Sequence, residues 1–350
     1  MIGVALEGGG AKGSYQAGAY IALLENGIKP DIITGTSIGS LNAAVMAQGD
    51  IDKVVNLWLN ASTDIFGIDS EIIKKLKHKD FNFKDLKPTF HNIKEIIENK
   101  GIDASKYYDL IKNAVDEKKL RKSKIKFGLI TVKMDGKPTP VQITIDDIPE
   151  GKVADYIMAS CYLPLFKLKP IIDNNYYIDG GFYNNVPISL AQQYGCKTIY
   201  SIRIKGIGFN RNKIDKDTKI IEIKPRKNLG NIIIFDREST ENNIKLGYYD
   251  ALKVIKNLDG LDYYFKSKKD NYYDKILKNI DDKLIVRLKF KYHAKTKKEL
   301  LIKVMENILD DNKVNPYKIY NFKVILFKAK TKYRIKDPNA KKLIKNCKLI

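Results

Sequence analysis

Gly35, Ser37 and Gly39 form the pattern Gly-x-Ser-x-Gly. The β-branched segment 32–34, Ile-Ile-Thr, predicts a strand before it, and the segment 40–46 after it predicts a helix. In such a tight turn, side chains at the two glycine positions would collide. The serine hydroxyl projects from the end of the sheet at the positive end of a helix. The pattern therefore indicates a nucleophile for acyl transfer, and a plain helix N-cap is the alternative interpretation of Ser37.

A glycine-rich segment, 8–13, follows the apolar run 3–6. Because glycine has no side chain, a substrate oxygen can approach its backbone amide closely. At a helix start such amides can form an oxyanion hole. The amides assigned to this role belong to Gly8, Gly9, Gly10 and Ala11. The same segment spells Gly-x-Gly-x-x-Gly, the dinucleotide-binding pattern, which requires an acidic residue at the end of the second strand. Because Asp31 precedes that strand here, a nucleotide site is disfavoured.

Lys12 and Gly13 complete the segment, at the start of a helix predicted over 14–25. A cation near a helix N-terminus is unfavourable by a few tenths of a kcal/mol (~0.3) or more. Two interpretations of Lys12 therefore stay open: an anionic group nearby compensates it, or it is an ordinary solvated lysine.

Asp179 is the second candidate catalytic group. It ends the predicted strand 176–178 and is followed by Gly180 and Gly181. Parallel sheets present their sites at the carboxyl ends of their strands, so this carboxylate can face the serine turn. The alternative is a tight turn in which the carboxylate binds its own backbone.

A serine nucleophile usually takes a histidine base. The chain has only three histidines, His78, His91 and His293, and none lies at the end of a predicted strand of the sheet. Ser37, Asp179 and His293 do follow the α/β-hydrolase order, but that fold places its elbow after several strands. A histidine triad is therefore disfavoured.

Short strands alternate with helices, which predicts an α/β fold with a mostly parallel sheet. Further strands are expected at 127–132, 141–145, 165–172 and 198–204. The charged segment 51–124, with helical patterns at 70–77, 93–98 and 105–120, predicts a helical insertion over the site that can act as a lid. A helix at 238–258 closes a main domain of residues 1–260.

The remaining segment, 261–350, is predicted to be mostly helical, and it is strongly basic within a chain of net charge +22. It holds 25 Lys or Arg residues against 10 Asp or Glu residues, so it attracts polyanions such as anionic lipid headgroups or nucleic acid. The whole chain has only seven Arg residues, which disfavours sequence-specific DNA recognition. A solvated surface produced by compositional bias is the alternative. Thr296 and Glu299 form a capping box that predicts a helix through Leu309.

The three cysteines have no regular spacing, so neither a disulfide framework nor a metal site is expected. No calcium loop, metal site or cofactor motif is recognised. Met1 leads into the first strand without a basic leader, and no apolar run reaches the ~20 residues of a membrane span. We expect a cytoplasmic protein that can contact membrane surfaces peripherally.

Together, segment 8–13, the Ser37 turn and Asp179-Gly180-Gly181 resemble the motifs of the patatin-like phospholipase family. The blocks 159–164 and 184–187 are also similar to that family, and the resemblance covers about residues 1–205. It implies a three-layer α/β/α domain that hydrolyses lipid acyl esters without a cofactor.

The resemblance also implies roles for individual residues. Ser37 attacks the ester carbonyl, Asp179 takes its proton without a histidine, and Lys12 occupies the family's basic position. Amides around Gly9, Gly10 and Ala11 receive the oxyanion. Acyl transfer, thioester hydrolysis and a non-catalytic membrane-binding protein on the same fold remain the alternatives.

Overall fold

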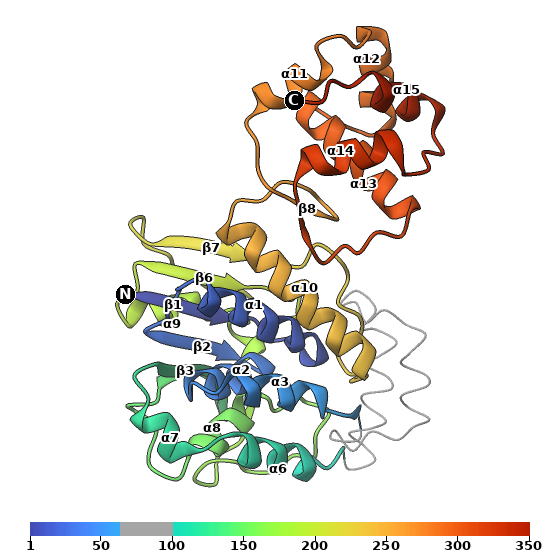
Figure 1. The fold of residues 1–350 in the computed structure, drawn as a ribbon. Coiled ribbons are helices and arrows are strands. Elements are labelled where there is room, and N and C mark those ends of the chain that lie inside the picture. The colour runs from blue at the N-terminus through green and yellow to red at the C-terminus, as the bar shows by residue number, and fades with distance from the viewer. Residues whose placement is uncertain (64–100) are drawn as a thin grey trace. The chain divides into compact units, whose positions relative to one another are not determined.

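The computed structural model describes residues 1–63 and 101–350. The chain forms two compact units, Met1–Ala251 and Leu252–Ile350 (Figure 1). The division falls inside helix α10 (Arg237–Ile255), earlier in the chain than the boundary predicted at residue 260.

The amino-terminal unit is built on a seven-stranded sheet with the path β4-β3-β2-β1-β6-β7 and with β5 paired to β3. All neighbours from β3 to β7 along this path are parallel, while β4 and β5 run antiparallel to β3. The predicted α/β class with a mostly parallel sheet is therefore confirmed. The strands are β1 (Ile2–Leu6), β2 (Ile32–Thr36), β3 (Lys126–Asp135), β4 (Lys137–Thr144), β5 (Tyr177–Asp179), β6 (Thr198–Ile202) and β7 (Lys219–Ile223).

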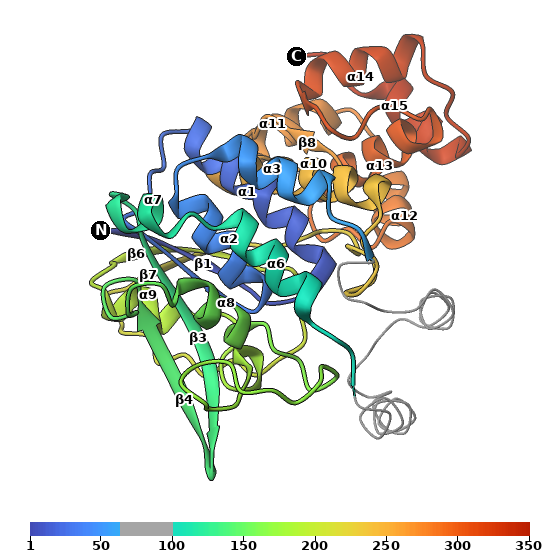
Figure 2. The same ribbon diagram turned by 90° about the horizontal axis from the view of Figure 1, so that it is seen from below.

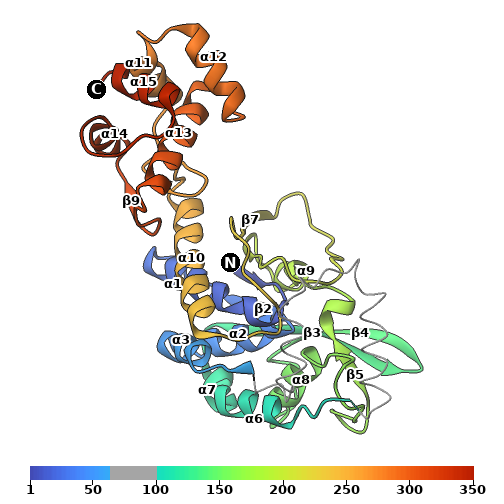
Figure 3. The ribbon, with the colours of Figure 1, turned by 90° about the vertical axis from the view of Figure 1, so that its right-hand side faces the viewer.

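Helices cover both faces of this sheet. Helices α1 (Ser14–Glu25) and α2 (Ile38–Ala47) lie on one side, and α9 (Ile188–Gln193) lies on the other (Figure 3). Central strands covered on both faces cannot alternate polar with apolar residues. The apolar run of β1 meets that requirement, and in β2 the hydroxyls of Thr34 and Thr36 donate to backbone carbonyls. Both strands are buried almost throughout. The layers are those of an α/β/α domain.

Three described helices belong to the segment 51–124: α3 (Ile51–Leu59), α6 (Ser105–Ala114) and α7 (Glu117–Lys122). Helix α3 packs on α1 and α2, and α6 packs on α8 (Val153–Ser160). The single helix predicted over 105–120 is two helices, because the Asp116 side chain accepts from Lys119 N and starts a new one. The helices predicted at 70–77 and 93–98 lie outside the described residues, so the lid stays a prediction.

The prediction of a strand over 165–172 is wrong. This segment makes only isolated bridges, from Phe166 to Ile102 and from Ile172 to Asn175. Pro164 and Pro170 have no amide hydrogen to donate to a ladder, which prevents regular pairing despite the apolar side chains between them.

The carboxyl-terminal unit is mostly helical, as predicted (Figure 2). Its helices are α11 (Asp270–Leu277), α12 (Asp282–Lys291), α13 (Lys297–Asp311), α14 (Phe322–Thr331) and α15 (Pro338–Asn346), beside a short pair of strands, β8 (Tyr264–Phe265) and β9 (Ile319–Tyr320). They enclose an apolar core of their own. The predicted capping box is present, with Glu299 N donating to Thr296 Oγ1 at 3.0 Å. No helix in the described ranges is long and apolar enough to cross a membrane.

Candidate active site

The sheet brings Ser37 and Asp179 to the same point. Strand β2 ends with Thr36 opposite Ile130 of β3, and β5 ends with Asp179 opposite Thr131, the next residue of β3. Since β4 occupies the other edge of β3 at Thr131, β2 and β5 share one edge and run toward each other. Their carboxyl ends therefore meet, and each delivers its candidate residue at that junction.

The Ser37 turn has the geometry expected of a nucleophile elbow. Ser37 has φ 56° and ψ −133°, a left-handed conformation that costs a residue with a side chain about 1–3 kcal/mol. A Cβ on Gly35 would overlap the Gly39 carbonyl oxygen, and one on Gly39 would lie 2.5 Å from the Leu6 oxygen. Both glycines are thus required by close backbone approach. Ser37 itself is partly accessible to solvent.

Ser160, at the end of α8, supports this turn. The Ser37 amide donates to Ser160 Oγ at 3.0 Å, and the Ser160 hydroxyl donates to the Ile130 carbonyl at 2.7 Å. The hydroxyl thereby links the strained elbow to β3. Sequence reasoning assigned no role to Ser160, although it lies in the block 159–164 that carried part of the family resemblance.

Replacing Ser160 with alanine is expected to lower the free energy of unfolding by about 1–3 kcal/mol, because a buried carbonyl and an amide lose their partner. The same loss loosens the nucleophile, so kcat should fall about tenfold or more while KM changes little. Urea unfolding and steady-state kinetics measure the two effects. A variant with full kcat would show that Ser160 does not position Ser37.

Asp179 lies in a dry environment. Its side chain is 4% exposed, Oδ1 accepts from Gly181 N at 2.7 Å, and Oδ2 makes no hydrogen bond of standard geometry to any described residue. Burial raises the pKa of Asp179 to about 6, while the Ser37 hydroxyl and the Gly181 amide act in the opposite direction. The carboxylate is thus a stronger base than an exposed aspartate, and the Ser37 hydroxyl is near enough to influence it.

Tyr107 and Cys161 are buried and lie close enough to Asp179 for its charge to raise their pKa values. Burial, together with the charge of Asp179, raises the pKa of the Cys161 thiol to about 12. Burial likewise raises the pKa of Tyr107 far above its usual range. Both groups therefore stay neutral at physiological pH, so Cys161 is not present as the reactive thiolate.

The glycine-rich segment follows β1 and enters a short 3-10 helix at Gly10–Gly13. Gly8 and Asn185 clamp each other: Gly8 N donates to the Asn185 carbonyl, and Asn185 Nδ2 donates to the Gly8 carbonyl, each at 3.1 Å. Asn185 thus ties this segment to the loop that follows Asp179. Its positioning role could not be read from the sequence.

Two of the four amides assigned to the oxyanion hole already have backbone partners. Gly8 N is in the clamp, and Ala11 N donates to the Ile232 carbonyl at 2.8 Å. The Gly9 and Gly10 amides make no hydrogen bond to any described residue. They are therefore the donors that this conformation leaves available for a substrate oxygen.

The remaining predicted positions have structural contacts. Lys12 Nζ donates to the Lys205 carbonyl at 3.3 Å, across the segment that follows β6. A Cβ on Gly13 would lie 2.6 Å from the Trp58 ring, and one on Gly180 would overlap the Ile130 carbonyl oxygen. These glycines let a helix and a turn pack tightly beside the site.

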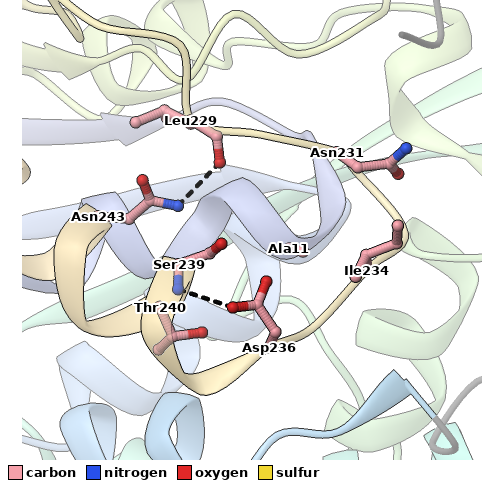
Figure 4. Close-up of a pocket in the computed structure, with 8 residues that line it drawn as sticks. All are labelled: Ala11, Leu229, Asn231, Ile234, Asp236, Ser239, Thr240 and Asn243. Carbon is pink, nitrogen blue, oxygen red and sulfur yellow. Dashed lines mark hydrogen bonds between the residues drawn. The ribbon is translucent and has the colours of Figure 1, made fainter. Parts of the chain in front are cut away.

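Two pockets flank the glycine-rich turn and the elbow. The first, of about 250 Å³, is lined mainly by polar residues of the loop before α10 and its first turns, and it reaches Ala11 (Figure 4). The second is apolar and begins at Ile38, next to the elbow serine. It is lined by Ile38, Leu41, Leu57, Trp58, Ala61, Tyr107, Leu110 and Phe235. Phe235 borders this apolar pocket, and its chain neighbours Ile234 and Asp236 border the polar one, so the two pockets are adjacent.

No cluster of three or more potential metal ligands occurs within residues 1–63 and 101–350. The described part of the amino-terminal unit also contains no histidine, since His78 and His91 fall in 64–100 and His293 belongs to the carboxyl-terminal unit. Among the described residues of this unit, Asp179 is a buried carboxylate whose pKa is influenced by the Ser37 hydroxyl.

Comparison with protein families agrees with this geometry. The family model described as "Patatin-like phospholipase" matches residues 4–191, which is more than half of the chain. The chain belongs to the patatin-like phospholipase family. The matched range contains the glycine-rich segment, the Ser37 elbow and Asp179, so all three motifs lie within the family domain.

Relatives in this family are much longer than the chain. Lysophospholipase NTE1 of Kluyveromyces lactis is 29% identical over 220 residues, which cover 59% of this chain and 13% of that protein. Patatin-like phospholipase domain-containing protein 7 of Rattus norvegicus is 25% identical over 210 residues, covering 58% and 13%. Among solved structures, VipD from Legionella pneumophila aligns over 99% of this chain and 83% of that chain, with 16% identity and a TM-score of 0.41.

Proposed function

We propose that the chain is a lipid acyl hydrolase of the phospholipase A or lysophospholipase type, with Ser37 and Asp179 as its catalytic pair. The observation that carries this proposal is the meeting of β2 and β5 on one edge of β3. That junction places a strained, partly accessible serine beside a buried carboxylate of raised pKa. The family membership and the names of the relatives support lipid esters as the substrate class.

The reaction begins as Ser37 Oγ attacks the ester carbonyl carbon while its proton passes to Asp179 Oδ2. The Gly9 and Gly10 amides receive the negative charge that develops on the carbonyl oxygen. The tetrahedral intermediate then expels the alcohol, which takes the proton back from Asp179. Water, activated by the same carboxylate, cleaves the acyl-enzyme and frees the fatty acid.

The two pockets suit the two ends of such a substrate. The apolar pocket holds only about 10 Å³ in this conformation, so an acyl chain enters between Ile38 and Phe235 only as their side chains move apart. The chain would then keep water away from the carboxylate. The polar pocket of about 250 Å³ reaches Ala11 in the glycine-rich turn, and we assign the headgroup to it. The same catalytic pair could transfer the acyl group to an alcohol instead of water, and it could cleave a thioester instead of an oxygen ester. Product analysis with alcohol acceptors separates a hydrolase from a transferase.

Incubation with a fluorophosphonate is expected to add mass to the peptide that contains Ser37. Because burial raises the pKa of Asp179 to about 6, the carboxyl is protonated below that pH and cannot accept the serine proton. The labelling rate should therefore fall about tenfold per pH unit below pH 6 and level off above it. Mass spectrometry of samples quenched across a pH series measures this.

Ser37→Ala is the control, and it should stay unlabelled at every pH. Circular dichroism at each pH separates loss of the base from acid unfolding. An unlabelled wild-type protein that is fully folded would contradict the proposed function. A flat rate between pH 4 and 8 would remove Asp179 as the base.

A further inference from the structure

The last two helices of the carboxyl-terminal unit, α14 and α15, pack against each other as a helical hairpin. Helix α14 buries the stripe Phe322, Ile325, Leu326 and Ala329 in the core of the unit, and α15 buries Ala340, Leu343 and Ile344 in the same core. Since both inner stripes face one core, the opposite faces of both helices are directed to solvent.

These outer faces combine apolar and basic side chains. Val324 and Phe327 are 49% and 54% exposed, and they lie at the i and i+3 positions of the outer stripe of α14. Lys328 follows Phe327, while Lys341, Lys342 and Lys345 line the exposed side of α15. We call these six residues the hairpin face. None of its four lysines makes an ion pair with a described residue.

The charge of this segment identifies its partner as an anion. Residues 321–350 contain ten Lys or Arg residues and one acidic residue, Asp337. Asp337 is itself paired with Lys291 at 2.7 Å, so it does not offset the charge of the hairpin face. A surface this basic attracts anionic headgroups by about 1 kcal/mol for each Lys or Arg near the membrane.

The apolar side chains distinguish a bilayer from a nucleic acid. Phe327 and Val324 can enter the boundary between headgroups and acyl chains while the lysines contact the headgroups, as in interfacial amphipathic helices. Nucleic acid would leave Val324 without an apolar partner. The segment also has a single Arg, the residue suited to bidentate hydrogen bonds with bases or phosphates. We propose that the hairpin face docks the protein on anionic phospholipid surfaces.

Membrane docking would hold an acyl hydrolase at the surface that contains its substrate, and only this purpose rests on the proposed function. Binding and catalysis can be measured separately. Vesicle binding is followed in a Ser37→Ala background, where no lipid is consumed, and catalysis is followed with a water-soluble ester in protein that retains Ser37. A failure of one measurement therefore leaves the other interpretable.

The test is co-sedimentation of the full chain with phosphatidylcholine vesicles that contain or lack phosphatidylserine. The Ser37→Ala protein is expected to bind only the vesicles with phosphatidylserine. Reversing Lys328, Lys341 and Lys345 to glutamate should weaken binding at least about 100-fold, and Phe327→Ser about tenfold. The same changes in the Ser37 protein should leave hydrolysis of the soluble ester unchanged.

Helix α12 offers matched controls in the same unit. Lys283→Glu, Arg287→Glu and Lys289→Glu together change the net charge by the same amount, and Phe290→Ser removes an aromatic ring that is 84% exposed. Both controls should keep most of the vesicle binding. Thermal unfolding of every variant verifies that each one folds.

Three results would overturn the proposal. The first is vesicle binding that survives reversal of the hairpin lysines in a folded protein. The second is an equal loss of binding in the α12 controls, which would indicate net charge alone. The third is tighter binding to a double-stranded oligonucleotide than to phosphatidylserine vesicles, which would assign the surface to nucleic acid.

Discussion

Replacing Ser37 with alanine is expected to reduce kcat for ester hydrolysis by about 10⁴-fold or more, because the covalent route disappears and only substrate binding and the amides remain. The fold should be retained. Alanine inherits the left-handed conformation of Ser37 and removes only the hydroxyl at the turn, while the backbone bond from residue 37 to Ser160 remains. Initial rates with a soluble ester, and fatty acid release from phospholipid vesicles, measure the loss.

Two further variants serve as comparisons for Ser37→Ala. Ser105→Ala changes an exposed serine on α6, away from the elbow, and should keep wild-type activity. Ser37→Gly should be as inactive as Ser37→Ala yet more stable by about 1 kcal/mol, since glycine relieves the φ of 56°. A Ser37→Ala protein with more than a tenth of the wild-type kcat would exclude Ser37 as the nucleophile.

Replacing Asp179 with asparagine is expected to lower kcat about 10³-fold or more and at the same time to stabilise the protein at neutral pH. Asparagine cannot accept the serine proton, but its carbonyl can keep the hydrogen bond from Gly181 N. The gain in stability follows from the raised pKa. Burial makes the folded state hold a proton on Asp179 up to about pH 6, whereas the unfolded state releases it near 3.8.

The sign of the pH effect follows from this difference. Between pH 3.8 and about 6 the folded state binds more protons than the unfolded state, so the contribution of Asp179 to stability falls as the pH rises. Above pH 6 the loss is complete and amounts to about 3 kcal/mol as an order of magnitude. Asparagine is neutral at every pH, so the Asp179→Asn variant does not lose this stability.

Urea unfolding of wild type and Asp179→Asn at pH 4 and pH 7 tests this prediction. The two free energies of unfolding should be similar at the acidic pH and should diverge at the neutral pH, with the asparagine variant more stable. Asp135→Asn, which removes one negative charge at an exposed position of β3, is the matched control for the change in net charge. A variant less stable than wild type at pH 7 would mean that the charged carboxylate is stabilised in the fold.

Much of the fold could be predicted because its signals are local. The apolar run of β1, the β-branched segment of β2, the Gly35 and Gly39 spacing, and the Thr296 capping box each act within a few residues, and the structure contains all of them. The strand predicted over 165–172 failed for a local reason as well, since its prolines remove ladder donors that hydrophobicity does not report. The break at Asp116 was missed because its N-cap interrupts an otherwise helical pattern.

The candidate site likewise has some features that depend on neighbouring residues and others that depend on residues distant in the chain. The elbow at Ser37 and the glycine-rich turn follow from the local sequence, since side-chain size and backbone freedom over a few residues produce both. Three features arise only in the folded chain: β5 ends where β2 ends, Asp179 is buried deeply enough to raise its pKa, and Ser160 and Asn185 hold the two turns. Strand pairing, burial and hydrogen bonds join residues that are distant in the chain, and no short pattern of residue types encodes those partners.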